Sequence, residues 1–378
     1  MKTNPDMKGV RIVSDRHDLK SFIEFPYQHY QNDEHWIPPL KVDQKKLVDK
    51  KKNPFFNTAD RALFLAEKNG KIVGRIAAVD DRKFNDYNEG NFGFFGFFEC
   101  VNDQSIANLL FKVAGDWLKD RGRSTVMGPT NPGMMDTVGI LVEGFEYDPS
   151  IMMPYNKSYY DELIMNAGFE KAMDLLAFRV TDETVSLDRI ERAETIVRRR
   201  LPSLVIRKVN LKNFHEEVEI VRSIFNSAWA NNWGFSPMSK EEFEHLAKDL
   251  KTIVDTDFAH IAEVDGKPVA FSIALPDFNQ ALKHTDGSLL PFGIFKLLYY
   301  GRKIDQIRTA LMGVIPEYQG KGIDALLHKE AIQNGLSRNI CKSELSWVLE
   351  SNVEMVRVAE RIGGSIEKRY RMYKQELS

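Results

Sequence analysis

The sequence predicts an α+β protein, with a mainly antiparallel sheet flanked by helices, built as two similar halves. Residues 62–81 and 258–275 each contain two β-type runs, joined by Asn69-Gly70 in the first half and Asp265-Gly266 in the second. Such pairs tolerate the positive φ angles of a tight hairpin turn. The two hairpins stand about 200 residues apart, which suits a duplicated domain rather than a short-repeat solenoid.

Each predicted hairpin is followed by the same two elements in the same order. An apolar strand comes first and an amphipathic helix second, at Phe92–Cys100 and Ser105–Lys119, then again at Ile307–Ile315 and Ile323–Ser337. A chain of 378 residues, 43% hydrophobic and 28% charged, is also long for a single core. We therefore expect one domain over residues 1–184, a helical linker over 185–203 and a second domain over 204–378.

The predicted linker ends in three arginines, Arg198, Arg199 and Arg200, before Pro202 stops the helix. These cations either meet a phosphate group or complement the dipole at a solvated helix end. Both interpretations stay open at this point.

Composition excludes several classes of function. The 52 Lys and Arg residues nearly balance the 54 Asp and Glu residues, so we expect no nucleic-acid partner. Two cysteines without CxxC spacing predict no metal site and a reducing cytoplasm. The first residues lack the apolar core of a signal peptide. The longest apolar stretch, Leu289–Tyr300, is well short of the roughly 20 residues of a spanning helix, so we expect no membrane span.

The segment Met312–Leu327 carries the most chemical information. It reads MGVIPEYQGKGIDALL: an apolar strand, a loop with two glycines, and an amphipathic helix. Glycines allow close approach of the backbone, and the first turn of a helix leaves N–H groups unpaired, so the loop suits a diphosphate. By itself, a Gly-x-Gly turn is just as often a plain strand-to-helix connection.

This segment resembles the GNAT N-acetyltransferase superfamily. Residues 319–324, QGKGID, follow the family's loop of Gln or Arg, two residues, Gly, one residue, then Gly or Ala, except at Asp324. An acid there either crowds a phosphate or caps the first helical turn. Residues 352–364, NVEMVRVAERIGG, resemble the family's closing helix. The resemblance implies two tandem GNAT-like domains, with the acyl-coenzyme A site in the second.

The resemblance also implies the roles of particular residues. Two splayed strands would hold the pantetheine arm, and the expected cofactor-binding residues are Val314, Ile315, Gln319, Gly320, Lys321, Gly322, Ile323, Asp324 and Asn352. Asn352 could also be a simple helix N-cap. Ala359 stands where many members have a tyrosine that donates a proton to the departing thiolate. Tyr318, Tyr370 and Tyr373 are alternatives for this general acid, although each could instead be a half-buried tyrosine that only packs. For the base we nominate Glu350, which could instead be merely exposed.

The first half lacks the cofactor motif. Its strand-to-helix junction, residues 97–105, contains no glycine and has acids where a diphosphate would lie. Residues 156–171 still resemble a GNAT closing helix and its exit, so we interpret this half as a degenerate GNAT-like domain that shapes the acceptor side. Residues 128–136 could line an acceptor site or be a structural crossing. Leu289–Tyr300 could cover a greasy acyl chain or be a core or interface helix.

Three functions follow from these patterns. The first is an acyl-coenzyme A-dependent N-acyltransferase, with acetyl-coenzyme A or another acyl-coenzyme A as the expected donor and the amine of a small molecule, amino acid or peptide as acceptor. The second, prompted by Asp324 and Ala359, is a protein that binds acyl-coenzyme A or another ligand without turnover, as a sensor or scaffold. The third is a Fem-like transferase that uses aminoacyl-tRNA. The sequence leaves the acceptor, the acyl-chain length and the oligomeric state open.

Overall fold

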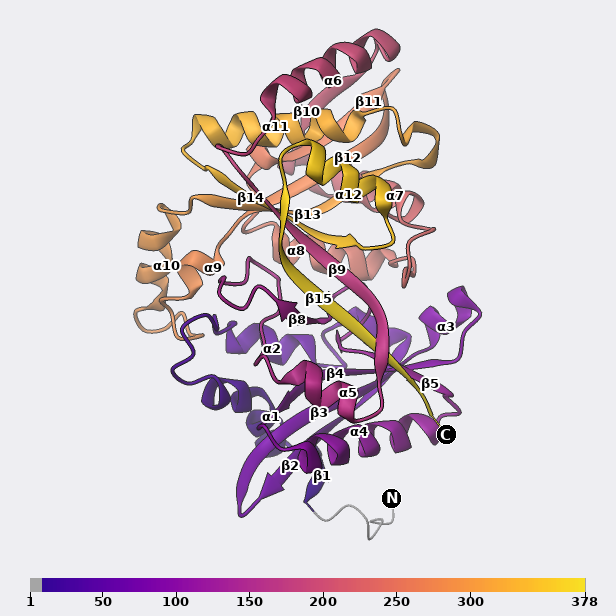
Figure 1. The fold of residues 1–378 in the computed structure, drawn as a ribbon, viewed down its shortest axis with the longest axis vertical. Helices are drawn as coiled ribbons and strands as arrows, with labels where there is room; N and C mark the ends of the chain where they lie inside the picture. Colours follow the sequence, from indigo (N-terminus) through magenta and orange to yellow (C-terminus); the bar gives the residue numbers. More distant parts are fainter. Residues whose placement is uncertain (1–8, 378) are drawn as a thin grey trace. The chain divides into compact units, whose positions relative to one another are not determined.

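The chain folds into two units, neither of which is a continuous stretch of sequence. The computed structural model describes residues 9–377 (Figure 1). Unit 1 contains the described residues up to Asp174, together with Thr285–Ile294 and the chain from Arg369 onwards. Unit 2 contains Leu175–His284 and Phe295–Lys368. The predicted division of the sequence into domains at residues 1–184 and 204–378 therefore remains a proposal.

Unit 1 is a mixed sheet with helices. Its elements in chain order are β1 (Val10–Ile12), α1 (Arg16–His29), α2 (Lys41–Leu47), the 3-10 helix η2 (Pro54–Asn57), β2 (Ala59–Lys68), β3 (Lys71–Asp81), α3 (Arg82–Asn88), β4 (Phe92–Cys100), α4 (Gln104–Lys119), β5 (Thr125–Gly128), β6 (Thr130–Asn131), β7 (Thr137–Val138), β8 (Ile140–Glu143) and α5 (Tyr160–Asn166). The sheet order begins β1-β2-β3-β4-β5, with only the β4–β5 pair parallel.

Unit 2 repeats this plan. Its elements are α6 (Leu187–Arg200), β10 (Val205–Lys208), η3 (Leu211–Asn213), α7 (Phe214–Ala228), α8 (Lys240–Leu250), η4 (Thr256–Phe258), β11 (Ala259–Val264), β12 (Lys267–Pro276), α9 (Asn279–Leu282), β13 (Gln306–Val314), η5 (Pro316–Tyr318), α11 (Ile323–Ser337), β14 (Lys342–Leu349) and α12 (Val353–Arg361). The order β14-β13-β12-β11-β10 is antiparallel except for the β13–β14 pair.

Three elements run from one unit into the other along the chain. They are β9 (Glu170–Thr181), α10 (Gly293–Gly301) and β15 (Ser365–Glu376). The unit 2 part of β9 pairs antiparallel with β14, from Leu175 opposite Leu349 to Thr181 opposite Lys342. The unit 1 part of β15 pairs antiparallel with β5 and β8. The last strand of each half thus completes a sheet in the other unit, which the local sequence pattern does not predict.

The hairpins form as the turn residues predict. Asn69 and Gly70 have φ angles of 54° and 74°, and Asp265 and Gly266 have φ angles of 52° and 73°. Both turn residues are therefore in the left-handed region that a two-residue hairpin requires. The predicted α+β fold with a largely antiparallel sheet is confirmed.

Each unit has its own apolar core. In unit 1, α4 buries one face on the sheet, with Leu110, Ala114 and Leu118 at most 1% exposed. The run FGFFGFF in β4 is largely buried. In unit 2, α11 packs between the sheet and α6, with Leu326 and Leu327 in a cluster that also contains Val197 of α6. This packing fixes the start of α11, where the glycine loop ends.

Candidate functional site

The glycine loop of unit 2 joins β13 to α11 and leaves the start of the helix open. Gly320 and Gly322 have φ angles of 69° and 86°, which side-chain-bearing residues rarely adopt. Gly322 is the N-cap of α11, and no side chain within residues 9–377 caps the helix. The first N–H groups of α11 therefore point out of the helix without a side-chain partner, while the buried side chain of Ile323 anchors the turn. This is an anion-binding geometry.

The strand before this loop separates from its parallel neighbour. β13 and β14 pair only from Gln306 opposite Lys342 to Thr309 opposite Leu345. In the pairing with β12, Thr309 lies opposite Ala274 and Leu311 opposite Ile273, so one residue is inserted at position 310. A bulge of this kind bends a strand, and beyond it the two parallel strands diverge.

The direction of the backbone groups in the opening follows from strand alternation. The Ile315 N–H donates to the Val269 carbonyl at 3.0 Å, so Ile315 faces β12. Val314 and Met312 must then direct their backbone groups to the side of β14. In agreement, the Trp229 indole donates to the Met312 carbonyl at 2.8 Å and the Gln319 amide donates to the Val314 carbonyl at 3.0 Å. The N–H groups of Val314 and Met312 face the opening, where an extended amide chain could pair with them.

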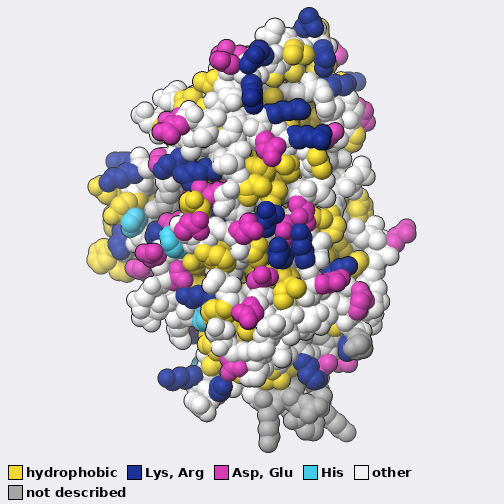
Figure 2. All heavy atoms as spheres, in the orientation of Figure 1, with side chains coloured by type: hydrophobic (Ala, Val, Ile, Leu, Met, Phe, Trp, Pro, Cys, Tyr) yellow, Lys and Arg dark blue, Asp and Glu magenta, His cyan; other side chains and the backbone are white. Residues whose placement is uncertain are grey.

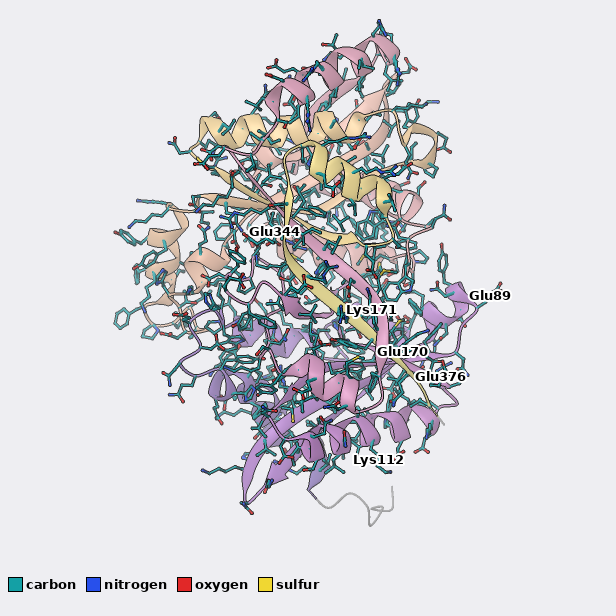
Figure 3. All side chains as sticks on the ribbon, in the orientation of Figure 1. Glu89, Lys112, Glu170, Lys171, Glu344 and Glu376 are labelled. Carbon is teal, nitrogen blue, oxygen red and sulfur yellow. The ribbon has the colours of Figure 1, made fainter. Side chains whose placement is uncertain are left out.

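A cluster of buried charges lies at the closed end of the opening. Its members are Arg308 on β13, Glu344 and Ser346 on β14, and Lys368 on β15, each at most 4% exposed; Figure 3 labels Glu344. Ser346 Oγ donates to Glu344 Oε1 at 2.6 Å, and Lys368 Nζ donates to Glu344 Oε2 at 2.9 Å. Arg308 Nε donates to Ser346 Oγ at 2.8 Å. We call these four residues the charged cluster.

The ionisation of the charged cluster is set by its own members. Burial alone would raise the pKa of Glu344, but the neighbouring Lys368 and Arg308 cations hold that pKa below its usual range. Burial would lower the pKa of Lys368, but Glu344 and Glu367 raise it. Both groups are therefore charged near neutral pH. A carboxylate with a lowered pKa is a poor general base, although it can hold and orient a cation.

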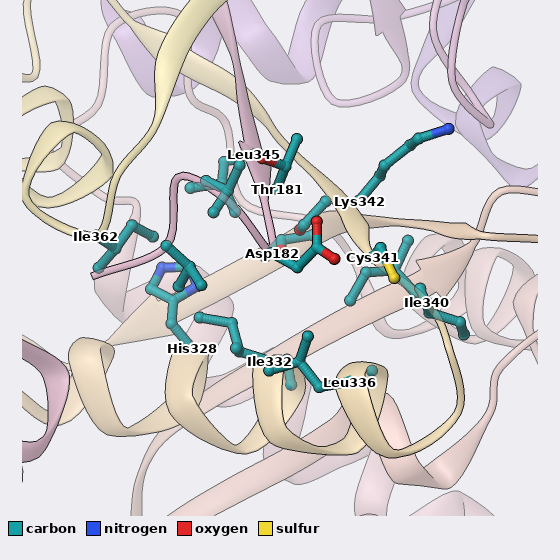
Figure 4. Close-up of a pocket in the computed structure, with 17 residues that line it drawn as sticks. Thr181, Asp182, His328, Ile332, Leu336, Ile340, Cys341, Lys342, Leu345 and Ile362 are labelled. Carbon is teal, nitrogen blue, oxygen red and sulfur yellow. The ribbon is translucent and has the colours of Figure 1, made fainter. Parts of the chain in front are cut away.

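The opposite face of the same two strands is mainly apolar, although Asp182, Lys342 and Ser343 also line the space beneath it. Side chains alternate along a strand, so Thr309 and Leu345 point away from the charged cluster, toward α11. They line a small cavity of about 30 Å³ together with residues of α11, including His328, Ala331, Ile332 and Leu336 (Figure 4). Burial lowers the pKa of His328, which keeps the imidazole neutral. The closed end of the opening therefore has one charged and one apolar side.

The predicted cofactor residues fall into two groups. Gln319, Gly320, Lys321, Gly322 and the start of α11 form the loop, and Val314 faces the opening, whereas the Ile315 N–H is used by β12. Asp324 lies half-buried in the first turn of α11. Asn352 is the N-cap of α12, where its side chain accepts from the Met355 N–H at 3.2 Å. The capping role of Asn352 is therefore present, and a contact with a ligand remains a prediction.

The candidate acids and bases are less well placed than the loop. Glu350 lies half-buried in the turn after β14 and remains a candidate only. Ala359 is 1% exposed and packs in the apolar cluster with Leu345. Tyr373 belongs to unit 1, where its hydroxyl donates to Asp161 at 2.5 Å. Tyr318 is half-buried beside the loop, with the Lys321 ammonium 4.4 Å from its ring centre.

Sequence reasoning missed the charged cluster. A signal was present, because Arg308 interrupts the apolar run of β13, and Glu344 and Ser346 stand two residues apart in β14. Polar residues at alternate positions of a strand share one face of the sheet. Without knowledge that β13 and β14 are neighbours, nothing in the sequence brings these residues together.

In unit 1, protein side chains occupy the positions that correspond to the glycine loop and the strand opening of unit 2. At the start of α4, the Asp103 carboxylate accepts from the Ser105 hydroxyl at 2.6 Å, from Lys68 Nζ at 2.9 Å and from the Ser105 N–H at 3.0 Å. These bonds, the one from the Ser105 hydroxyl first, lower the pKa of Asp103 to about 2. Along β4, the Asn131 side chain accepts from the Phe97 N–H at 2.6 Å. A Cβ atom on Gly96 would lie 1.7 Å from the Thr130 carbonyl oxygen. Residues 128–136 thus make a structural crossing against β4.

Two parallel strands that diverge after a bulge, followed by a glycine loop at a helix start, define the GNAT class of acyltransferase. A model of the family described as "Acetyltransferase (GNAT) family" matches residues 218–364, all of which belong to unit 2 except Thr285–Ile294. Protein YghO of Escherichia coli strain K12 is 39% identical over 377 residues, covering 97% of this chain and 95% of that protein. The bacterial ceramide synthase of Caulobacter vibrioides is 36% identical over 383 residues, covering 99% of both chains.

Solved structures agree on the fold. A tandem GNAT protein from the clavulanic acid biosynthesis pathway matches with a TM-score of 0.55 at 12% identity, covering 98% of this chain and 99% of that one. A glucosamine N-acetyltransferase region of a fungal multidomain β-N-acetylglucosaminidase matches with a TM-score of 0.57 at 16% identity, covering 97% of this chain and 38% of that one. The chain belongs to the GNAT family as a tandem member and is an N-acyltransferase.

Proposed function

We propose that this enzyme transfers a fatty acyl group from coenzyme A to the primary amine of a lipid-like amino alcohol. The observation that carries the donor is the opening between β13 and β14, which leads from the charged cluster to the glycine loop. The N–H groups of Val314 and Met312 that face the opening can donate to the amide carbonyls of a pantetheine arm, and the N–H groups at the glycine loop can donate to a diphosphate. Support for the acceptor comes from the Caulobacter relative named a ceramide synthase, since a ceramide is an N-acylated amino alcohol.

The two sides of the closed end suggest how the substrates enter. A thioester at the end of the pantetheine arm would lie near the bulge, where its acyl chain must turn toward one face of the sheet. The apolar side under α11 favours a hydrocarbon chain, which leaves the polar side to the amine. There the two cations Arg308 and Lys368 outnumber Glu344, so they favour the neutral amine over its ammonium form. The cavity under α11 has room for about one water molecule, so a long acyl chain must displace the side chains of Ile332 and Leu336.

The reaction that this arrangement supports is direct transfer. The amine nitrogen forms a bond to the thioester carbonyl carbon, and the carbon–sulfur bond then breaks. The nitrogen loses a proton and the departing thiolate gains one, so the products are an amide and free coenzyme A. N–H groups of β13 that face the opening would stabilise the oxyanion. We assign Glu344 a positioning role, because its lowered pKa does not suit a proton acceptor.

The test is a transfer assay with the full chain. Acetyl-, octanoyl- and palmitoyl-coenzyme A are each supplied with sphinganine, and free thiol and amide product are measured together. We expect amine-dependent thiol release that is fastest with a long chain. Binding of coenzyme A without thiol release would instead indicate a sensor. Tight binding of aminoacyl-tRNA in moderate salt, with no use of any acyl-coenzyme A, would favour the Fem-like alternative.

The chain-length assignment is tested with Ala331→Leu. Ala331 is 5% exposed, lies on α11 and lines the cavity, so a larger side chain fills the space under the helix. We expect the variant to lose about tenfold or more of its activity with palmitoyl-coenzyme A while it keeps activity with acetyl-coenzyme A. Equal losses with both donors would place the acyl chain elsewhere.

A further inference from the structure

The segment around α10 exposes large apolar side chains to an unusual degree. Leu290, Phe292, Phe295, Leu298 and Tyr299 are 78%, 70%, 67%, 63% and 59% exposed. They lie within ten consecutive residues, and Figure 2 shows hydrophobic side chains gathered over α10 beside Lys and Arg side chains. Of the alternatives for Leu289–Tyr300, the core helix is therefore excluded, because these side chains are not buried.

The charges of this segment all have one sign. Between Gly287 and Ile304 the chain contains Lys296, Arg302 and Lys303, all exposed, and no acidic residue. The Lys303 ammonium donates to the Tyr299 hydroxyl at 3.0 Å and lies 4.4 Å from that ring. A lysine whose stem follows an apolar surface can keep its charge at the water boundary.

Apolar and basic side chains on one short helix fit an anionic lipid surface. Aromatic and aliphatic groups enter the boundary between headgroups and acyl chains, and nearby Lys and Arg residues contact lipid phosphates. With nine residues, α10 is too short to cross a bilayer, and no helix in the described part of the chain is long and apolar enough to do so. A segment of this kind lies in the plane of the membrane surface.

We propose that residues 289–303 dock the enzyme on anionic membranes by inserting Leu290, Phe292, Phe295 and Leu298 between the lipids. The basic residues Lys296, Arg302 and Lys303 hold the segment against the phosphates. The proposal rests on exposure and charge, so it stands independently of the acyl donor. It also deepens the proposed function, because a lipid-like amine would be drawn from the surface on which the enzyme sits.

Vesicle co-sedimentation tests the proposal. The full chain is mixed with neutral phosphatidylcholine vesicles and with vesicles that also contain about 30 mol % phosphatidylglycerol, at low and moderate salt. We expect binding that requires the anionic lipid and weakens with salt. No sedimentation with anionic vesicles would overturn the proposal.

Two sets of variants separate the contributions of the segment. The triple change Phe292→Ser, Phe295→Ser and Leu298→Ser should lower vesicle affinity by about 100-fold or more. Each change in the series Lys296→Gln, Arg302→Gln and Lys303→Gln should lower it by about fivefold. The control is Val42→Ser with Val205→Ser, two exposed valines outside the segment, which should leave vesicle binding unchanged.

Two further measurements keep membrane docking distinct from other outcomes. Sedimentation velocity without lipid should show the same mass for the parent and the serine variant. A dimer that disappears in the serine variant would show that a second copy covers the segment, against the proposal. Transfer between detergent-dispersed substrates should be unchanged in the serine variant, so loss of docking and loss of acyl transfer are separate results.

Discussion

Gly320 and Gly322 share a left-handed backbone but differ in what surrounds them. A Cβ atom on Gly322 would lie 2.8 Å from Val197 Cγ2 of α6, so a larger residue there disturbs the packing of that helix. A Cβ atom on Gly320 meets nothing within 4 Å. Gly320 is therefore the position at which a side chain can obstruct a ligand without a clash inside the protein.

We predict that Gly320→Val weakens coenzyme A binding by about tenfold or more, because its side chain occupies the approach to the loop. The matched control is Gly266→Val. Gly266 has a φ of 73°, also meets nothing within 4 Å, and lies in the β11–β12 turn of the same unit. Both variants should lose about 1–2 kcal/mol of stability, since each forces a side chain into the left-handed region. Calorimetric titration with coenzyme A should distinguish them, and equal affinities would remove Gly320 from the ligand site.

At the scale of elements, the sequence predicts which segments form turns, strands and helices better than it predicts which strands become neighbours in a sheet. The hairpin turns, the strand β4 and the helix α11 follow from residues adjacent in the sequence, as does the glycine loop. The charged cluster does not, because Arg308 and Glu344 come from strands that become neighbours only in the sheet. The sequence also does not predict the crossing of residues 128–136, since a loop rich in Pro and Gly gives no sign of what it packs against.

Two helix caps offer a test of which elements take part in binding. Asp103 caps α4 in unit 1, and Asn352 caps α12 in unit 2. Replacing either with alanine should cost about 1 kcal/mol, because each cap satisfies a helix N–H. We predict that only Asn352→Ala also weakens coenzyme A binding, measured by titration, since only its helix adjoins β14. If both alanine variants bind coenzyme A like the parent, Asn352 is a cap and nothing more.

At the scale of the whole molecule, the two units share a plan and differ in chemistry. Unit 1 has a carboxylate cap and a crossing segment where unit 2 has open glycines and diverging strands. The exchange of final strands through β9 and β15 means that neither unit is complete without residues from the other half of the sequence. Neither the hydrophobic periodicity nor the turn residues indicate this exchange of strands, because a strand has the same sequence pattern whichever sheet it joins.

Each unit contains a histidine whose pKa is lowered by burial, half-buried His29 in unit 1 and buried His260 in unit 2, and together these make stability depend on pH. In unit 1, burial, with Lys157 and Arg75, lowers the pKa of His29 to about 4. In unit 2, burial, with Lys208, lowers the pKa of His260 from 6.5 to about 4. Below pH 6.5 the unfolded chain gains protons that these folded imidazoles do not, so both groups reduce the free energy of unfolding as the pH falls from 6.5 to 4.

We predict that His260→Leu removes part of this dependence without loss of a hydrogen bond. His260 is 2% exposed, and neither of its ring nitrogens has a hydrogen-bond partner among the described residues. Urea unfolding followed between about pH 7 and about pH 5 should show a smaller fall in stability for the variant than for the parent. The carboxylates that titrate at lower pH are common to both proteins, so the difference in slope belongs to this one side chain. Identical slopes would mean that the imidazole is protonated in the folded protein, and that burial does not keep it neutral.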